Sequence, residues 1–410
     1  MKKTNLWAAI ALTMMALTSA CSNNDDDELP FGADLALTRA EQQLVTESND
    51  FAFDLFRLVQ DERKSQVLSP VSIVHALGML NNGAVGETQA QICRALGFGD
   101  AAVDSINLFC LKMLRRMPNL DRQTQVMIAN TIYMNQGYEM LPEFVSKARL
   151  FYDATPETRD FHDGKTRDVI NQWASDHTEG MIEEVLKEGE FDPDAVSCLL
   201  NAIYFKGSWT HQFRKDYTFR KEFNHAGETE ELTYCDMMQQ LRRFEYAETY
   251  DVQALQMPYG NGSFVMTILL PKMMKDKPLN RLPSVPTGDE WRLLNKQMIS
   301  VEVDVKLPSF EINTDIDLIP IMQKLGMTKA FTPEADFQNF CNEPTFISLM
   351  KQSARIKVDE EGTEVAAVTT GGLTTTSIDW IDFTADHPFL YVISEQQTGT
   401  VLFIGQYTGY

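Results

Sequence analysis

The segment "KVDEEGTEVAAVTTGGLTTTS", which runs from Lys357 to Ser377, decides how the rest of the chain is interpreted. Four acidic residues surround its Gly-Thr pair, and an uncharged run of small and β-branched residues follows them. Ordinary loops carry turn formers and charges, whereas Gly371-Gly372 and the threonines bury too little apolar area for a core strand. The composition therefore predicts a segment that is able to be either a loop or a strand.

The overall composition indicates a folded, exported protein rather than a nucleic-acid binder. The 410 residues are 44% hydrophobic and 23% charged, as in globular proteins. A formal charge of −22 argues against a nucleic-acid partner, because phosphates require a basic surface. The sequence has no HExxH motif and no cluster of histidines and cysteines. We therefore expect neither a metal site nor a cofactor.

The N-terminus carries an export signal. Lys2 and Lys3 precede an apolar run that is too short to span a membrane, and small residues follow up to Cys21. This pattern resembles a bacterial lipoprotein signal, with residues 1–20 removed, Cys21 lipidated and residues 21–47 forming a flexible acidic tether. The expected location is the outer membrane, at the cell surface or on the periplasmic face, with the lipid as the only membrane contact. The alternative is an ordinary secretory signal with a spare cysteine.

The remaining cysteines are five in number and show no CxxC or regular spacing. An odd number of cysteines without regular spacing predicts buried free thiols rather than disulfides, although the protein is expected to be exported. These residues are Cys93, Cys110, Cys198, Cys235 and Cys341.

Hydrophobic periodicity predicts helices in the first part of the chain and strands in the second. One helix is expected to begin at Ser48-Asn49-Asp50, and a second, apolar on all sides, at Ser69. The pair Asn261-Gly262 lies between two apolar runs and predicts a hairpin. No linker interrupts residues 48–410, so we expect one α+β domain with large antiparallel sheets.

The order of these segments resembles the serpin family from Ser48 to the C-terminus. The resemblance implies a serpin-like fold with an exposed reactive-centre loop over about residues 360–382. A protease cuts this loop, and the cleaved loop inserts as a strand into the main sheet. The matching segments are "LSPVSIVHALGML", "NQWASDHTEGMI", "LLNAIYFKGSW", "LPSF", "LGMTKAF", "EADF", "KVDEEGTEVAA", "ADHPFLYVI" and "TGTVLFIG".

By this resemblance, the loop begins with a hinge in which Gly362 is the swing point and Thr363 is the first residue to turn inward. Small uncharged side chains are needed there, because buried charge costs more than strand hydrogen bonds return. Val365 and Val368 depart from the family's smaller residues, and their bulk is expected to slow insertion. The hinge comprises Glu361, Gly362, Thr363, Glu364, Val365, Ala366, Ala367 and Val368.

The family also opens its main sheet through a hydrogen-bonded network beneath it. The resemblance places Ser69, Ser72 and Asn201 in this network, with Gln352 where the family usually has a histidine. Glutamine offers donors and an acceptor, so the network survives without the imidazole's response to pH. Trp209 matches the tryptophan at the top of the sheet, where insertion begins.

The bond to be cut lies near the end of the loop. Counting fourteen residues from the hinge glycine gives Thr376-Ser377, and counting back from Phe383 gives Thr375-Thr376. A threonine before the bond suits the shallow pocket of elastase-like or subtilisin-like proteases and excludes trypsin-like ones. Leu373 is a lesser candidate and would imply a chymotrypsin-like or cathepsin-like target.

The resemblance therefore implies a monomeric suicide-substrate inhibitor of a serine, or else a cysteine, endopeptidase, which it holds as a covalent acyl-enzyme. A non-inhibitory binding or structural module is the alternative, favoured by Val365 and Val368. We do not expect an enzyme, since no GxSxG or Walker motif is present. Asp386-His387 near Ser377 suggests a triad, but in the family that pair leads into a buried strand.

Overall fold

The computed structural model describes residues 34–99, 101–224, 233–272, 281–363 and 380–409. Several predicted features lie outside these ranges. They are residues 1–20, Cys21, the hinge from Glu364 to Val368, Leu373 and the two candidate bonds at residues 375–377.

Helix α1 (Arg39–Val59) begins earlier than the sequence suggested. Thr38 caps it, in a capping box with Glu41, and Leu35 is already buried. The predicted start at residue 48 and the tether up to residue 47 are therefore wrong. Asn49 was expected at the start of the helix, but it lies inside α1. Its side chain bonds residues far along the sequence: Nδ2 donates to Gly399 O at 2.8 Å, and Oδ1 accepts from Val401 N.

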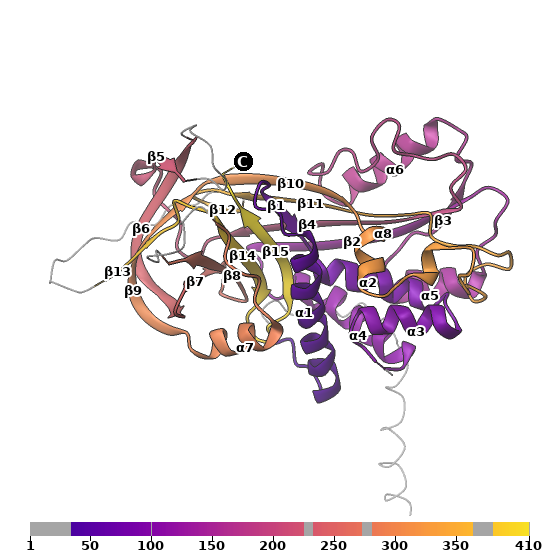
Figure 1. Ribbon diagram of the computed structural model, residues 1–410, viewed down its shortest axis with the longest axis horizontal. Coiled ribbons are helices and arrows are strands. Elements are labelled where there is room, and N and C mark those ends of the chain that lie inside the picture. Colours follow the sequence, from indigo (N-terminus) through magenta and orange to yellow (C-terminus); the bar gives the residue numbers. More distant parts are fainter. Residues whose placement is uncertain (1–33, 100, 225–232, 273–280, 364–379, 410) are drawn as a thin grey trace, which may run out of the picture. The chain divides into compact units, whose positions relative to one another are not determined.

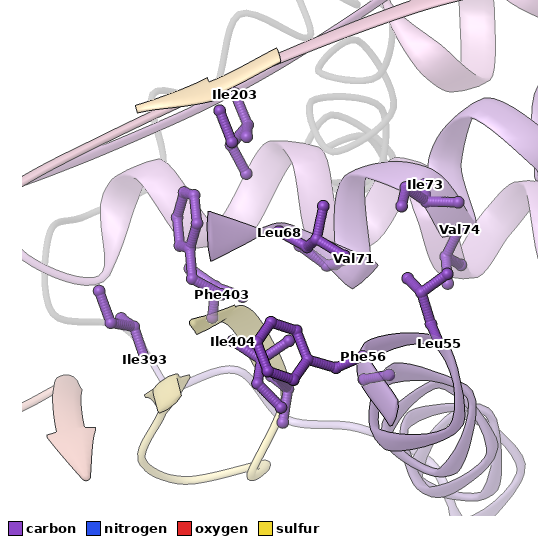
Figure 2. Close-up of a cluster of buried hydrophobic side chains, with 14 of the residues drawn as sticks. Leu55, Phe56, Leu68, Val71, Ile73, Val74, Ile203, Ile393, Phe403 and Ile404 are labelled. Atoms are coloured by element: carbon purple, nitrogen blue, oxygen red, sulfur yellow. The ribbon is translucent and has the colours of Figure 1, made fainter. Parts of the chain in front are cut away.

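Helix α2 (Pro70–Asn81) is the central helix, as predicted. Ser69 is its N-cap, Pro70 is its first residue, and all twelve residues are buried. Figure 2 shows its Val71 between Leu55 and Phe56 of α1 and the strand residues Ile203, Phe403 and Ile404. The other helices are α3 (Gly86–Ala95), α4 (Val103–Arg116), α5 (Pro142–Tyr152), α6 (Lys165–Asp176), α7 (Gly288–Lys296) and α8 (Ile319–Lys324), with short 3-10 turns at Met117–Asn119, Lys215–Tyr217 and Lys329–Phe331.

The smaller of the two sheets has the strand order β10-β11-β4-β2-β3, with the short β12 paired to β4. Helix α6 lies on one face of it, while α2, α4 and α5 lie on the other (Figure 1). The strands are β2 (Thr124–Asn135), β3 (Glu157–Arg159), β4 (Ser197–Ser208), β10 (Phe310–Asp317), β11 (Leu349–Val358) and β12 (Gly362–Thr363).

The larger sheet has the order β1-β15-β14-β8-β7-β6-β9-β13, with β5 paired to β6. The predicted hairpin joins β7 to β8, and Gly262 has φ 90° in its turn. Most pairs in both sheets are antiparallel, which confirms the predicted α+β class. The strands are β1 (Gln66–Leu68), β5 (Phe219–Phe223), β6 (Thr233–Glu248), β7 (Val252–Tyr259), β8 (Phe264–Pro271), β9 (Ile299–Pro308), β13 (Ile381–Thr384), β14 (Phe389–Glu395) and β15 (Val401–Tyr407).

The five cysteines of the folded part are all buried free thiols, as predicted. Burial raises the pKa of the Cys110 thiol to about 12, so it stays protonated and inert. Among the described residues, no group of three or more His, Cys, Asp or Glu side chains is placed to hold a metal ion. Within the same ranges, no helix has both the length and the hydropathy needed to cross a bilayer.

Candidate strand-insertion site

The centre of the smaller sheet contains a seam between two parallel strands. Strands β4 and β11 pair in parallel from Cys198 opposite Leu349 to Ile203 opposite Ala354. Their outer neighbours, β2 and β10, pair with them antiparallel. Parallel pairing is slightly less stable per residue than antiparallel pairing, so this seam is the weakest join in the middle of the sheet.

A row of amides crosses the seam. In the strand register, Asn201 of β4 lies opposite both Asn130 of β2 and Gln352 of β11. Gln352 Nε2 donates to Asn201 Oδ1 at 2.7 Å, and Asn201 Nδ2 donates to Asn130 Oδ1 at 2.7 Å. All three side chains are buried. A strand that entered between β4 and β11 would have to separate Asn201 from Gln352.

The start of α2 joins this row from beneath the sheet. Gln352 Oε1 accepts from Ser69 N at 2.9 Å, while its Nε2 donates to Ser69 O and Ser72 Oγ, both at 2.9 Å. Ser72 Oγ donates to Asn201 Oδ1 at 2.6 Å. The structure thus brings together all four predicted residues, and we call Ser69, Ser72, Asn201 and Gln352 the amide–serine network.

Asn130 bonds to the amide–serine network through Asn201 but was missed in the sequence. A signal for it existed, because it is an amide in the middle of the buried strand run "VMIANTIYM". Buried polar groups need hydrogen-bond partners, so an asparagine there predicts one across the sheet. Only the pairing register of β2 and β4 shows that this partner is Asn201.

At the upper end of the seam, β4 takes a different partner. Gly362 lies opposite Ser208 and Thr363 opposite Gly207, in antiparallel pairing. A tight turn brings the chain back from β11, with Asp359 N donating to Gly362 O at 2.9 Å. The hinge was expected to enter the sheet only after cleavage. Instead, its Gly362 and Thr363 already pair with β4, while the residues from Glu364 on lie outside the described ranges.

Gly362 is required where it lies. Its φ is 132°, which L side chains rarely adopt. A Cβ built there would lie 2.3 Å from Gly207 O and 2.5 Å from both Ser208 Cα and Trp209 N. These neighbours are backbone atoms of the end of β4 and of the residue after it, and they cannot move aside alone. Any larger residue would therefore push the hinge off the strand.

Trp209 anchors the turn before the hinge and does not join the amide–serine network. Its Nε1 donates to Asp359 O and its backbone N donates to Glu361 O, both at 3.0 Å. Its ring stacks on Tyr259, with centroids 4.3 Å apart and planes at 13°. The predicted position at the top of the sheet is thus occupied by a rigid aromatic pair.

Two further contacts hold Glu360 and Glu361, where the hinge begins. Lys215 Nζ pairs with Glu361 Oε1 at 2.8 Å, and this contact raises the pKa of Lys215. Thr218 Oγ1 donates to Glu360 Oε1 at 2.6 Å. Lys215 and Thr218 belong to the segment after β4, 142 to 146 residues earlier in the chain, so no sequence signal linked them to the hinge.

The far end of the loop returns to the larger sheet at β13, which pairs in parallel with β9. Behind it, His387 Nδ1 lies 2.9 Å from Asp386 Oδ1, and its Nε2 lies 2.9 Å from Pro271 O. Burial opposes ionisation of Asp386, but His387 and Lys221 outweigh it and lower the pKa of this carboxyl. Both ring nitrogens of His387 have hydrogen-bond partners, so Asp386 and His387 stabilise the local structure by linking it to Pro271.

Comparisons with known proteins agree with this geometry. The family model described as Serpin (serine protease inhibitor) matches residues 46–409. Serpin B6 of Macaca fascicularis is 32% identical over 372 residues, covering 89% of this chain and 99% of that protein. The leukocyte elastase inhibitor of Sus scrofa is 31% identical, again covering 89% and 99%. The thermophilic serpin Tengpin in its native state superposes with a TM-score of 0.82 at 26% identity, covering 92% of this chain and 96% of Tengpin.

Proposed function

The chain belongs to the serpin family, and on that premise we propose that it is a suicide-substrate inhibitor of a serine endopeptidase. Cleavage of the loop forms an acyl-enzyme, in which a loop carbonyl is esterified to the protease's serine. Insertion of the freed strand into the seam then carries the protease away before water hydrolyses the ester. The inhibitor acts as a substrate and performs no catalysis of its own.

The antiparallel pairing of β12 on β4 is the observation that carries this proposal. If the chain after Thr363 continued between β4 and β11, it would run antiparallel to β4. Because β4 and β11 are parallel, it would be antiparallel to β11 as well. One parallel pairing would be exchanged for two antiparallel pairings. This exchange supplies a driving force, and the pairing that already exists at the top gives the strand its register.

We infer an elastase-like or subtilisin-like target. The residue before the cut, Thr376 or else Thr375, is short and β-branched, which suits a shallow specificity pocket. The relative named leukocyte elastase inhibitor supports the same class, at 31% identity over most of both chains.

We further propose that Cys21 is lipidated and holds the protein at the outer membrane. The small residues before Cys21 and the polar acidic stretch after it support this proposal. Cys21→Ser should move the protein from the membrane fraction to the soluble fraction. Unchanged fractionation would refute the anchor and leave the inhibitor proposal untouched.

Incubation with a panel of serine and cysteine proteases tests the inhibitor proposal. The expected result is a complex that survives SDS and has the summed mass of protease and inhibitor less the C-terminal peptide that cleavage releases. Thr363→Arg should be cut at the same bond yet give no such complex, because a guanidinium would have to enter the sheet unpaired.

The matched control is Glu364→Arg, which puts the same side chain at the neighbouring position. Strand alternation turns that position outward, so this variant should retain the complex. A wild-type loop that is cut without any stable complex would instead indicate the non-inhibitory alternative. Complex formation by Thr363→Arg equal to that of the wild type would exclude insertion as the mechanism.

A further inference from the structure

Helices α4 and α5 expose an apolar surface that the inhibitor mechanism does not use. Leu108 of α4 is 59% exposed and Leu150 of α5 is 58% exposed. Leu111 lies one turn after Leu108 on α4 and is half-buried. Between the helices and β2 is a hollow of about 290 Å³, lined chiefly by Leu111, Leu114, Arg115, Met127, Ile128 and Leu150. We call this surface the α4–α5 face.

The α4–α5 face is basic in a strongly acidic protein. Helices α4 and α5 carry Lys112, Arg115, Arg116, Lys147 and Arg149 against two acids, Asp104 and Glu143, although the whole chain has a formal charge of −22. Arg149 comes directly before Leu150 and is exposed. Within the described part of the chain, Arg115, Arg116 and Arg149 make no ion pair. The acids near them are Glu143, which pairs with Lys147, Asp104, one turn before Leu108, and Asp153, at the rim of the hollow. Unpaired arginines around exposed leucines are typical of surfaces that meet anionic lipid.

The same face adjoins the point where the N-terminal chain enters the folded body. Lys112 of α4 pairs with Glu41 in the first turn of α1 at 2.8 Å. Asp34 is the first described residue and lies thirteen residues after Cys21. Extended chain spans at most about 3.5 Å per residue, so a lipid on Cys21 leaves this region within roughly 45 Å of the bilayer.

We propose that the α4–α5 face docks on the phosphate-bearing membrane surface to which Cys21 is anchored. Leu108 and Leu150 enter the interfacial layer, and Arg115, Arg116 and Arg149 lie against lipid phosphates. We favour a lipid surface over a protein partner for two reasons: the face is basic, and it lies near the start of α1, where the chain from Cys21 reaches the folded body. The inference rests on the anchor proposed above and is independent of protease inhibition. Docking would hold the seam and the loop at a set orientation to the membrane.

Vesicle flotation of the mature chain carrying Cys21→Ser tests the face without the lipid. Vesicles of phosphatidylcholine alone should bind little protein, and vesicles with added phosphatidylglycerol should bind it in a salt-sensitive way. Replacing Arg115 and Arg116 with serine should weaken binding by about fivefold per arginine removed. Equal recovery with both vesicle types, or no binding to the anionic vesicles, would overturn the proposal.

Leu150→Asp has a matched control in Leu293→Asp. Leu293 of α7 is 57% exposed, almost the same as Leu150, but it lies on another element. Leu150→Asp should abolish vesicle binding, whereas Leu293→Asp should preserve it. Binding that depends on the arginines but not on Leu150 would assign the face to a soluble polyanion and refute membrane docking. All variants should form the protease complex as the wild type does, which separates a failure here from a failure of the inhibitor proposal.

Discussion

Gln352 and Asn201 are register partners on two parallel strands, and a single 2.7 Å hydrogen bond joins their side chains across the seam. Gln352 also accepts from the backbone N of Ser69, so one side chain ties both strands to the N-terminus of α2. An amide has no titratable proton near neutral pH, unlike the histidine usual in the family. The join between β4 and β11 is therefore expected to hold equally well from pH 5 to pH 8.

Gln352→Ala should weaken this join and lower the stability of the protein. The Ser69 N–H would be left without its buried partner, at about 1–3 kcal/mol, and the Asn201 Oδ1 would keep only the bond from Ser72. Denaturant unfolding should show the lower free energy of unfolding. The variant should also lose inhibitory activity faster on warming. A weaker join between β4 and β11 should let the uncut loop insert, and an inserted loop cannot be offered to a protease.

Gln172→Ala is the control for that variant, because Gln172 is an exposed glutamine of α6 outside the seam. It should resemble the wild type in both measurements. Wild-type stability in Gln352→Ala would mean that the amide–serine network does not hold the seam closed.

Gly362→Ala should detach the hinge from β4. The added Cβ meets backbone atoms at 2.3–2.5 Å, so the chain is expected to leave the strand rather than accept the overlap. Hydrogen exchange at the amides around Ser208 should become faster. Gly137→Ala is the matched control: Gly137 also has positive φ, at 104°, but a Cβ there meets nothing within 4 Å. Unchanged hydrogen exchange around Ser208 in Gly362→Ala would contradict the pairing of Gly362 and Thr363 with β4.

Cleavage by an elastase-like protease should release a C-terminal peptide that begins at Ser377, or else at Thr376. Mass spectrometry of this peptide identifies the bond directly. Thr376→Arg should shift inhibition toward trypsin-like proteases, because the pocket contact dominates the choice of substrate. A peptide that begins at Leu373 or earlier would show that the loop has been counted incorrectly.

His75 should make the protein less stable as the pH falls from about 6.5 to 5. Its ring is fully buried in α2, between Val71 O at 2.7 Å and Cys110 O at 3.2 Å, and burial lowers its pKa below the usual 6.5. Below pH 6.5 the unfolded chain binds a proton that the folded chain resists, so acidification favours unfolding.

His75→Gln should reduce the loss of stability between pH 7.5 and pH 5, as measured by denaturant midpoints at each pH. Carboxyl groups with lowered pKa values, such as Asp386, act at lower pH and do not enter this window. His162→Gln is the control, because that ring is 65% exposed. Equal pH dependence in wild type and His75→Gln would exclude the buried ring as its origin.

Features that depend on neighbouring residues were predictable from the sequence. Ser69 and Pro70 cap α2, whose apolar surface on every side announced a central helix. Asn261-Gly262 formed the hairpin, because a two-residue turn carries its own conformational requirement. The amide–serine network was predicted only through the resemblance, since its members come from three separate segments.

What the sequence by itself determined is thus the local chemistry: which segments are helix or strand, and which thiols stay buried and free. Tertiary structure alone decided which polar groups meet. Asn49 looked like a helix start until Gly399 and Val401 supplied its partners. Lys215 joined the hinge, and β12 paired with β4, through contacts more than 140 residues apart. Long-range pairing depends on register and packing, which no stretch of neighbouring residues encodes.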